Sequence, residues 1–178
     1  MNYFIQFLTY FRILIAPIIF ILITMYDSFG WALFLFLLAS ISDYWDGFLA
    51  RKYKLESVIG AVLDPVADKI LLTFIILALT LELSSIYIGI VGGIILVREF
   101  WVGALRDFNA RQNNSDATKV TLLAKTKTFI QFVAFSSYLF GLALNNSLIL
   151  FTSNFVLFLG LLITLQTGLS YTIATFKE

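Results

Sequence analysis

The chain has 178 residues, of which 60% are hydrophobic and only 13% are charged, whereas soluble domains contain about 25% charged residues. With a mean hydropathy of +0.94, this composition excludes an ordinary soluble domain and indicates an integral membrane protein, because one core of this size cannot cover so much apolar surface. The net charge is +1. The chain has no cysteine, which excludes disulfides and thiolate chemistry. It also has no histidine, so any acid–base or metal chemistry must use Asp, Glu, Lys, Arg, Tyr or water.

Six apolar segments are each long enough to form a membrane-spanning helix, which needs about 20 mostly apolar residues. In chain order they cover residues 8–26, 30–51, 59–82, 86–107, 122–144 and 148–175. Short polar breaks separate them, and the last segment is long enough to tilt or to extend past the bilayer. The sequence therefore predicts an all-α fold in which residues 1–178 form a single membrane domain, a bundle of six transmembrane helices.

The lysines and arginines lie on or near one side of this arrangement. The breaks after the first, third and fifth segments contain no Lys or Arg, and their charged residues are Asp27 and Glu82. By the positive-inside rule, both termini and the loops at 52–57 and 109–119 are expected in the cytoplasm. We therefore expect a multi-pass protein of the cell membrane.

Four aspartates gather where the second segment ends and the third begins. Asp43 and Asp46 lie in the stretch SDYWDGFLAR, and Asp64 and Asp68 follow in GAVLDPVAD. The spacing places each pair on one helical face, and the short loop makes the two helices antiparallel neighbours whose polar faces can meet. A carboxylate costs roughly 2.5–3.5 kcal/mol at the centre of a membrane helix, so four together indicate a specific function on the cytoplasmic side.

A divalent cation would offset both the burial and the mutual repulsion of these carboxylates. Ligation by oxygen alone suits Mg²⁺, Mn²⁺ or Ca²⁺, and the absence of Cys and His disfavours zinc or copper. The alternative is that the acids form interfacial salt bridges with Arg51, Lys52 and Lys69. That alternative is adequate for one aspartate near a helix end but less so for four on two facing helices.

The complete pattern of the region is Asp43-x2-Asp46-Gly47-x2-Ala50-Arg51-x8-Gly60-x3-Asp64-x3-Asp68. It resembles the signature of the CDP-alcohol phosphotransferase family at all eight fixed positions. The resemblance implies a six-helix membrane enzyme, usually a homodimer, with two divalent ions, Mg²⁺ or Mn²⁺. Such an enzyme transfers a substituted phosphoryl group from a CDP-linked donor to an alcohol and releases CMP.

The same resemblance implies roles for individual residues by their motif position. The metal ligands would be Asp43, Asp46, Asp64 and Asp68, and Asp68 would also be the catalytic base that takes the proton of the attacking hydroxyl. By position in this signature, the donor would be bound by Asp43, Gly47, Ala50, Arg51 and Gly60. Thr9 and Arg12 would also bind it, because Gln6-x2-Thr9-x2-Arg12 resembles the N-terminal pattern N-x2-T-x2-R of one branch of the family, with Gln in place of Asn.

A second group of charged residues, in the fourth and fifth segments, concerns the acceptor. Arg98 and Arg106 lie eight positions apart on nearly one helical face, and Lys125 and Lys127 open the fifth segment. An unpaired arginine inside the bilayer is costly, so Arg98 needs Glu99, another protein carboxylate or a ligand phosphate as its partner. Converging cations suit an acceptor that carries a phosphate, although the two lysines also fit ordinary positive-inside flanks.

Three stretches resemble the phosphatidylglycerophosphate synthase branch of the family: LDPVADKI, REF followed by LR, and K-x-K-T. This resemblance, from about residue 5 to about residue 135, implies that CDP-diacylglycerol and glycerol 3-phosphate give phosphatidylglycerophosphate and CMP. The residues expected to hold the acceptor phosphate are Arg98, Arg106, Lys125 and Lys127. Beyond residue 135 the apolar sequence indicates only membrane packing.

Other functions stay open on the sequence alone. The same chemistry could use another acceptor, and inositol phosphate would also need the basic group. A cation transporter could use the aspartates as an ion site, but a conduction path should continue to the far side, where only Asp27 and Glu82 lie. An intramembrane aspartyl protease needs two facing aspartates, not four.

Overall fold

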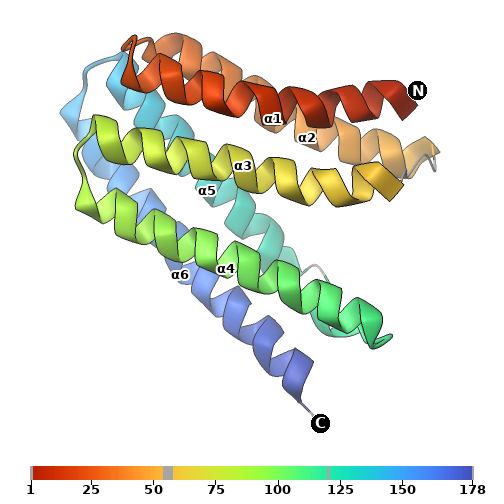
Figure 1. The fold of residues 1–178 in the computed structure, drawn as a ribbon. Helices are drawn as coiled ribbons and strands as arrows, with labels where there is room; N and C mark the ends of the chain where they lie inside the picture. The colour runs from red at the N-terminus through yellow and green to blue at the C-terminus, as the bar shows by residue number, and fades with distance from the viewer. Residues whose placement is uncertain (1, 54–57, 120, 178) are drawn as a thin grey trace.

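The computed structural model describes residues 2–53, 58–119 and 121–177 (Figure 1). Within these ranges, residues 2–6, 43–44, 46–53, 58–62 and 115 are described by their backbone only. The elements are α1 (Asn2–Thr24), α2 (Phe29–Tyr53), α3 (Val58–Glu82), α4 (Ile86–Arg111), a 3₁₀ turn η1 (Ser115–Thr118), α5 (Leu122–Ala143) and α6 (Ser147–Phe176).

The prediction of an all-α fold with six long helices is confirmed over the described residues. The main difference in the boundaries is at the start, where α1 begins at Asn2 and not near residue 8. Within the described ranges, three helices are long and apolar enough to cross a membrane, at Phe7–Thr24, Ile86–Arg111 and Ser147–Phe176, and Phe29–Ser42 is a shorter apolar stretch. Six membrane crossings therefore stay a prediction.

Local hydrogen bonding explains why the helices end where they do. Four residues just past helix ends have positive φ angles, namely Asp27, Ser84, Asn113 and Asn145. In each case the next amide donates back into the helix, as when Asn146 N donates to the Gly141 carbonyl at 2.9 Å, which satisfies a carbonyl left over at the helix end. At the helix starts, side chains accept hydrogen bonds from amides of the first turn: Ser85 from Ile88 N in α4, Thr121 from Ala124 N in α5, and Asn146 from Leu148 N and Ile149 N in α6.

The helices pack as two groups, α1 to α3 and α4 to α6, which diverge toward one end of the molecule (Figure 1). α1 packs against both α2 and α3, α3 packs against α4, and α6 packs against α4 and α5, while α5 also contacts α2. The connections α1–α2, α3–α4 and α5–α6 lie at the left in Figure 1, and both termini lie toward the other end. This arrangement agrees with the alternation of loops that the charge pattern predicts.

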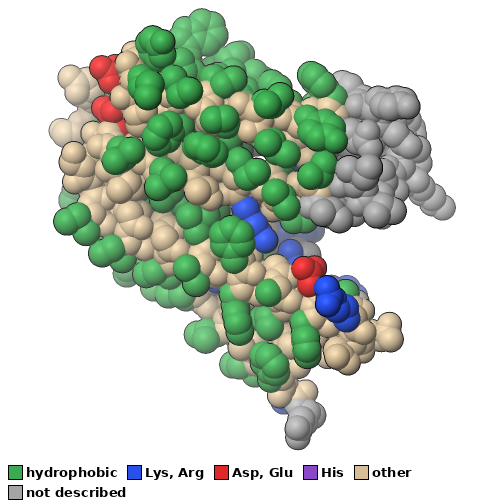
Figure 2. Space-filling view, in the orientation of Figure 1, with side chains coloured by type: hydrophobic (Ala, Val, Ile, Leu, Met, Phe, Trp, Pro, Cys, Tyr) green, Lys and Arg blue, Asp and Glu red, His purple; other side chains and the backbone are tan. Residues whose placement is uncertain are grey.

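Apolar side chains both fill the bundle and cover its outside. The core includes Ile19, Ile75, Phe135 and Leu157, whereas every long helix also exposes large apolar side chains, such as Leu14, Phe34, Leu81, Val97, Phe129 and Phe151. Figure 2 shows this apolar surface, with acidic side chains at the end that holds the α1–α2 and α3–α4 connections and basic ones where the two helix groups diverge. Such a surface suits lipid and not water.

Candidate active site

Two of the four motif aspartates are held by residues from the first helix. Thr9 Oγ1 donates a hydrogen bond to Asp64 Oδ1 at 2.6 Å, and Arg12 Nη2 donates to the same oxygen at 3.3 Å. Arg12 Nη1 donates to Asp68 Oδ1. Thr9 and Arg12 lie three residues apart, and Asp64 and Asp68 lie four apart, so each pair occupies one helical face. These contacts join α1 to α3.

The burial of these groups differs sharply. Arg12 is 0% exposed, while the Asp64 and Asp68 side chains are 37% and 53% exposed. The buried guanidinium therefore holds both carboxylates from the inside of the bundle and leaves them accessible from the outside. A buried arginine requires such partners, because an uncompensated buried charge is strongly destabilising.

Thr9 and Arg12 are predicted to bind the donor, but their described contacts are with the aspartates. Other predicted members of this site lie outside the described side chains: Asp43, Asp46, Gly47, Ala50, Arg51 and Gly60. The predicted meeting of four carboxylates is therefore untested. Among the described side chains, no group of three or more Asp or Glu that could hold a metal ion occurs.

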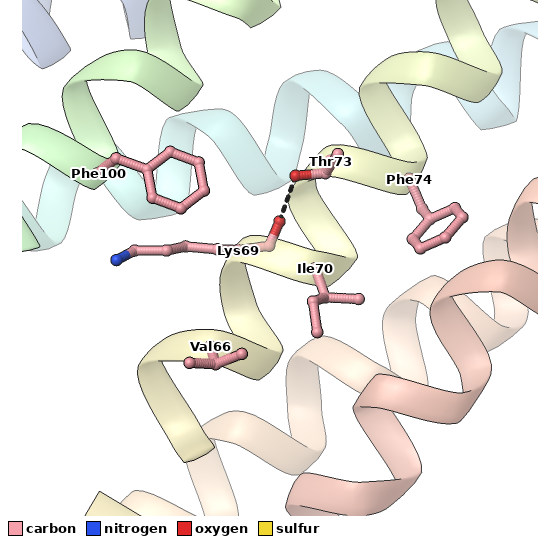
Figure 3. Close-up of a pocket in the computed structure, with 6 residues that line it drawn as sticks. All are labelled: Val66, Lys69, Ile70, Thr73, Phe74 and Phe100. Atoms are coloured by element: carbon pink, nitrogen blue, oxygen red, sulfur yellow. Dashed lines mark hydrogen bonds between the residues drawn. The ribbon is translucent and has the colours of Figure 1, made fainter. Parts of the chain in front are cut away.

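Lys69 follows Asp68 in the sequence but points to another helix. Its Nζ lies 5.0 Å from the centre of the Phe100 ring of α4, and a Cβ added to Gly103 would come within 2.8 Å of that nitrogen. Figure 3 shows Lys69 beside a groove of about 220 Å³ between α3 and α4, whose other lining residues are Val66, Ile70, Thr73, Phe74 and Phe100. Among the described residues, Lys69 forms no ion pair, and the described ion pairs of Asp64 and Asp68 are both with Arg12.

A separate basic cluster lies on α4 and α5. Arg98, which is 7% exposed, donates from Nη1 to Glu99 Oε1 at 3.1 Å, and Lys127 of α5 donates from Nζ to the same oxygen. Glu99 is thus the partner of Arg98 among the three candidates that the sequence leaves open. The shared carboxylate holds two buried cations together across two helices.

Arg106 joins this cluster through an aromatic ring of α6. The Cζ atoms of Arg98 and Arg106 lie 5.9 and 6.0 Å from the centre of the Tyr171 ring. Tyr171 is buried, and its hydroxyl accepts a hydrogen bond from Thr121 N at 3.3 Å. We refer to Arg98, Arg106, Lys127 and Glu99 as the basic cluster. Lys125 is exposed, and no contact in the described part of the chain links its side chain to the other cations.

The structure adds α6 residues that the sequence interpretation missed. Arg98 Nε donates to the Thr164 carbonyl at 3.0 Å, and Nη2 donates to Thr167 Oγ1 at 2.7 Å. Thr164, Thr167, Gly168 and Tyr171 follow the spacing i, i+3, i+4, i+7 of one helical face. This line of small and polar residues in an apolar segment is the signal that could have identified them, so α6 does more than pack in the membrane.

Comparison with known proteins agrees with the signature. Residues 5–166 match the CDP-alcohol phosphatidyltransferase family, so the family resemblance extends past residue 135, and the expectation that it fades there is wrong. Three similar proteins are each named CDP-diacylglycerol–glycerol-3-phosphate 3-phosphatidyltransferase. The protein of Rickettsia bellii is 41% identical over 77% of this chain and 74% of its own length. That of Rickettsia felis is 36% identical over 93% and 91%, and that of Salmonella typhimurium is 34% identical over 71% of each. The chain belongs to the CDP-alcohol phosphatidyltransferase family.

Proposed function

We propose that this protein transfers the phosphatidyl group of CDP-diacylglycerol to glycerol 3-phosphate, giving phosphatidylglycerophosphate and CMP. The observation that carries the proposal is the basic cluster on α4 and α5, because α4 packs directly against α3, the helix of Asp64 and Asp68. An uncharged acceptor would not need such cations, whereas a phosphate-bearing acceptor does. The names of the similar proteins support the same reaction.

The contact between α3 and α4 supports a common site. Lys69, the neighbour of Asp68, lies against Gly103, and Gly103 lies between Arg98 and Arg106 in α4. The aspartates and the basic cluster are therefore at a similar level along the two helices. An acceptor bound at the cluster could present its hydroxyl toward Asp68.

Two divalent ions, Mg²⁺ or Mn²⁺, are proposed to bind with Asp43, Asp46, Asp64 and Asp68 as ligands. The described residues fit this assignment, because Asp64 and Asp68 are accessible oxygen donors held in place by Arg12, and hard divalent cations prefer such oxygens. When bound, the ions would neutralise the diphosphate of the donor and the charge on the departing CMP.

The proposed chemistry needs one proton acceptor and one nucleophile. The primary hydroxyl of glycerol 3-phosphate attacks the phosphorus of the phosphatidyl group, and the bond from that phosphorus to CMP breaks. Asp68 takes the hydroxyl proton, a role that suits a positioned carboxylate in a chain without histidine. The acceptor phosphate is bound by four basic residues, Arg98, Arg106, Lys125 and Lys127. The donor CDP-diacylglycerol is bound by Thr9, Arg12, Gly47, Ala50, Arg51 and Gly60.

The proposal includes a location and an assembly. Six membrane crossings would place both termini, the aspartates and the basic cluster at the cytoplasmic face of the cell membrane, in agreement with the positive-inside rule. A homodimer is proposed from the family resemblance. Chemical crosslinking of the protein in its own membrane, compared with the purified protein in detergent, would test the dimer.

An acceptor panel tests the proposed reaction. The purified full chain in detergent, with Mg²⁺ or Mn²⁺ and CDP-diacylglycerol, is expected to release CMP and form a lipid phosphate when glycerol 3-phosphate is added. Removal of divalent ions with a chelator should stop the reaction, and added Mg²⁺ or Mn²⁺ should restore it. Turnover with inositol phosphate but not with glycerol 3-phosphate would overturn the acceptor assignment, and activity that survives chelation would overturn the metal assignment.

A further inference from the structure

We infer that α6 contains a positioning site for Arg98, formed by Thr164, Thr167 and Gly168, and that this site sets the affinity for the phosphate of the acceptor. The inference rests on the proposed function, and it assigns a role in acceptor binding to a helix that touches neither aspartate pair in the described contacts. The three residues act through Arg98 and are positioning residues.

The first argument is the number of bonds that hold the guanidinium. Arg98 Nε donates to the Thr164 carbonyl at 3.0 Å, and Nη2 donates to Thr167 Oγ1 at 2.7 Å. With Nη1 on Glu99, described residues accept from three of the five N–H donors that a guanidinium carries. Among the described contacts the other two N–H groups have no acceptor, and a bidentate phosphate contact uses two N–H groups.

The second argument is the hydrogen bonding of the threonines themselves. Thr167 Oγ1 donates to the Ile163 carbonyl at 2.8 Å, so its acceptor lone pairs are left to face Arg98. Thr164 Oγ1 donates to the Gly160 carbonyl and accepts from Gln131 Nε2 of α5 at 2.9 Å. One face of α6 therefore orients Arg98 of α4 while it is bonded to α5, the helix of Lys127.

The third argument is the space left by a missing side chain. A Cβ on Gly168 would lie 3.0 Å from Arg98 Cγ and 3.2 Å from Nε, closer than side chains normally approach. Alanine at this position would displace the arginine by a few tenths of an ångström. Gly160 of the same helix differs, because its nearest side-chain atoms would lie at 3.5 and 3.6 Å from an added Cβ, an ordinary contact.

These differences define variants with matched controls. Thr167→Val removes the hydroxyl oxygen that accepts from Arg98, and Thr167→Ser keeps a hydroxyl at this position. Thr172→Val is the control, because Thr172 Oγ1 also accepts a bond from α4, from Trp101 Nε1 at 2.9 Å, but does not touch Arg98. Gly168→Ala and Gly160→Ala form a second pair on the same helix.

The experiment measures the KM for each substrate with the purified full chain in detergent and Mg²⁺. Thr167→Val is expected to raise the KM for glycerol 3-phosphate about tenfold, in line with the loss of a hydrogen bond to a charged group, while the KM for CDP-diacylglycerol stays within about twofold. Gly168→Ala should act in the same direction. Thr167→Ser, Thr172→Val and Gly160→Ala should keep the wild-type acceptor KM.

Several results would overturn the inference. The first is an unchanged KM for glycerol 3-phosphate in both Thr167→Val and Gly168→Ala. The second is an equal change of the KM for glycerol 3-phosphate and the KM for CDP-diacylglycerol in these variants. The third is a KM for glycerol 3-phosphate that is as high in Thr167→Ser as in Thr167→Val. If Thr167→Val does not fold, Gly168→Ala against Gly160→Ala decides the question. Wild-type protein that ignores glycerol 3-phosphate counts against the proposed function instead, and the same variants are then measured with the acceptor that the panel identifies.

Discussion

At the scale of single residues, Asp68 combines accessibility with a fixed position. Its side chain is 53% exposed, and Arg12 Nη1 donates to one of its carboxylate oxygens. A base that abstracts a proton must be reachable by the substrate and held in place, and Asp68 meets both conditions.

Asp68→Asn is expected to abolish turnover without unfolding the protein. The amide oxygen can still accept from Arg12, but the group no longer takes a proton, so kcat should fall by at least about a hundredfold. CMP release measures this loss, and circular dichroism checks the fold. Asp107→Asn, which changes an exposed aspartate of α4, is the control and should keep wild-type activity. Full activity in Asp68→Asn would rule out the proposed base.

Arg12 is expected to be irreplaceable even by lysine. An ammonium cannot donate to Asp64 and Asp68 with the fixed fork of a guanidinium, so Arg12→Lys should lower kcat/KM about ten- to a hundredfold, the effect of losing one hydrogen bond between charged groups. Thr9→Ser, which keeps the hydroxyl that binds Asp64, should change kcat/KM little. Equal activities of Arg12→Lys and the wild type would show that the carboxylates do not need this support.

Residue contacts of this kind mark the limit of what the sequence predicts. The aspartate spacing along α2 and α3 is local, so the motif could be recognised and its helical faces assigned. The pairing of Arg12 with Asp64 spans 52 positions and depends on α1 packing against α3, which no periodicity encodes. The same holds for Arg98, whose acceptors on α6 lie 66 and 69 positions away.

At the scale of helices, boundaries were more predictable than packing. Apolar runs separated by polar breaks predicted all six long helices, because length and hydropathy alone distinguish a membrane helix from its connections. The packing of one helix on another depends instead on single small residues. In the contact of α3 with α4, a Cβ on Gly92 would lie 2.4 Å from Ile76 Cγ2, while Gly93 has no neighbouring atom within 4 Å of that position.

Gly92→Ala is therefore expected to destabilise the protein, and Gly93→Ala is its matched control. The added methyl group must push α3 and α4 apart, at a cost of about 1–3 kcal/mol, which lowers the unfolding temperature by several degrees. Gly93→Ala should leave that temperature unchanged or slightly raised, because alanine favours the helix. Thermal unfolding in detergent compares the two. Equal unfolding temperatures would show that the α3–α4 contact is looser than described.

At the scale of the whole molecule, the charge distribution agrees with the arrangement of the helices. The connections α1–α2, α3–α4 and α5–α6 share one end of the bundle (Figure 1), and they contain Asp27 but no Lys or Arg. Among the side chains that the structure describes, the basic ones visible in Figure 2 lie toward the end where both termini lie. The cations of the basic cluster and the carboxylates of Asp64 and Asp68 are thus carried by the long helices themselves.

The orientation in the membrane can be tested directly, because the chain has no cysteine. Single cysteines are placed at two exposed positions, Tyr26 in the α1–α2 connection and Gln112 after α4. With intact cells, a membrane-impermeant maleimide should label Tyr26→Cys only, because the positive-inside rule places Gln112 in the cytoplasm. Permeabilised cells should label both, which confirms that both thiols are reactive. Labelling of Gln112→Cys in intact cells would invert the proposed topology and place the basic cluster on the wrong side for a cytoplasmic acceptor.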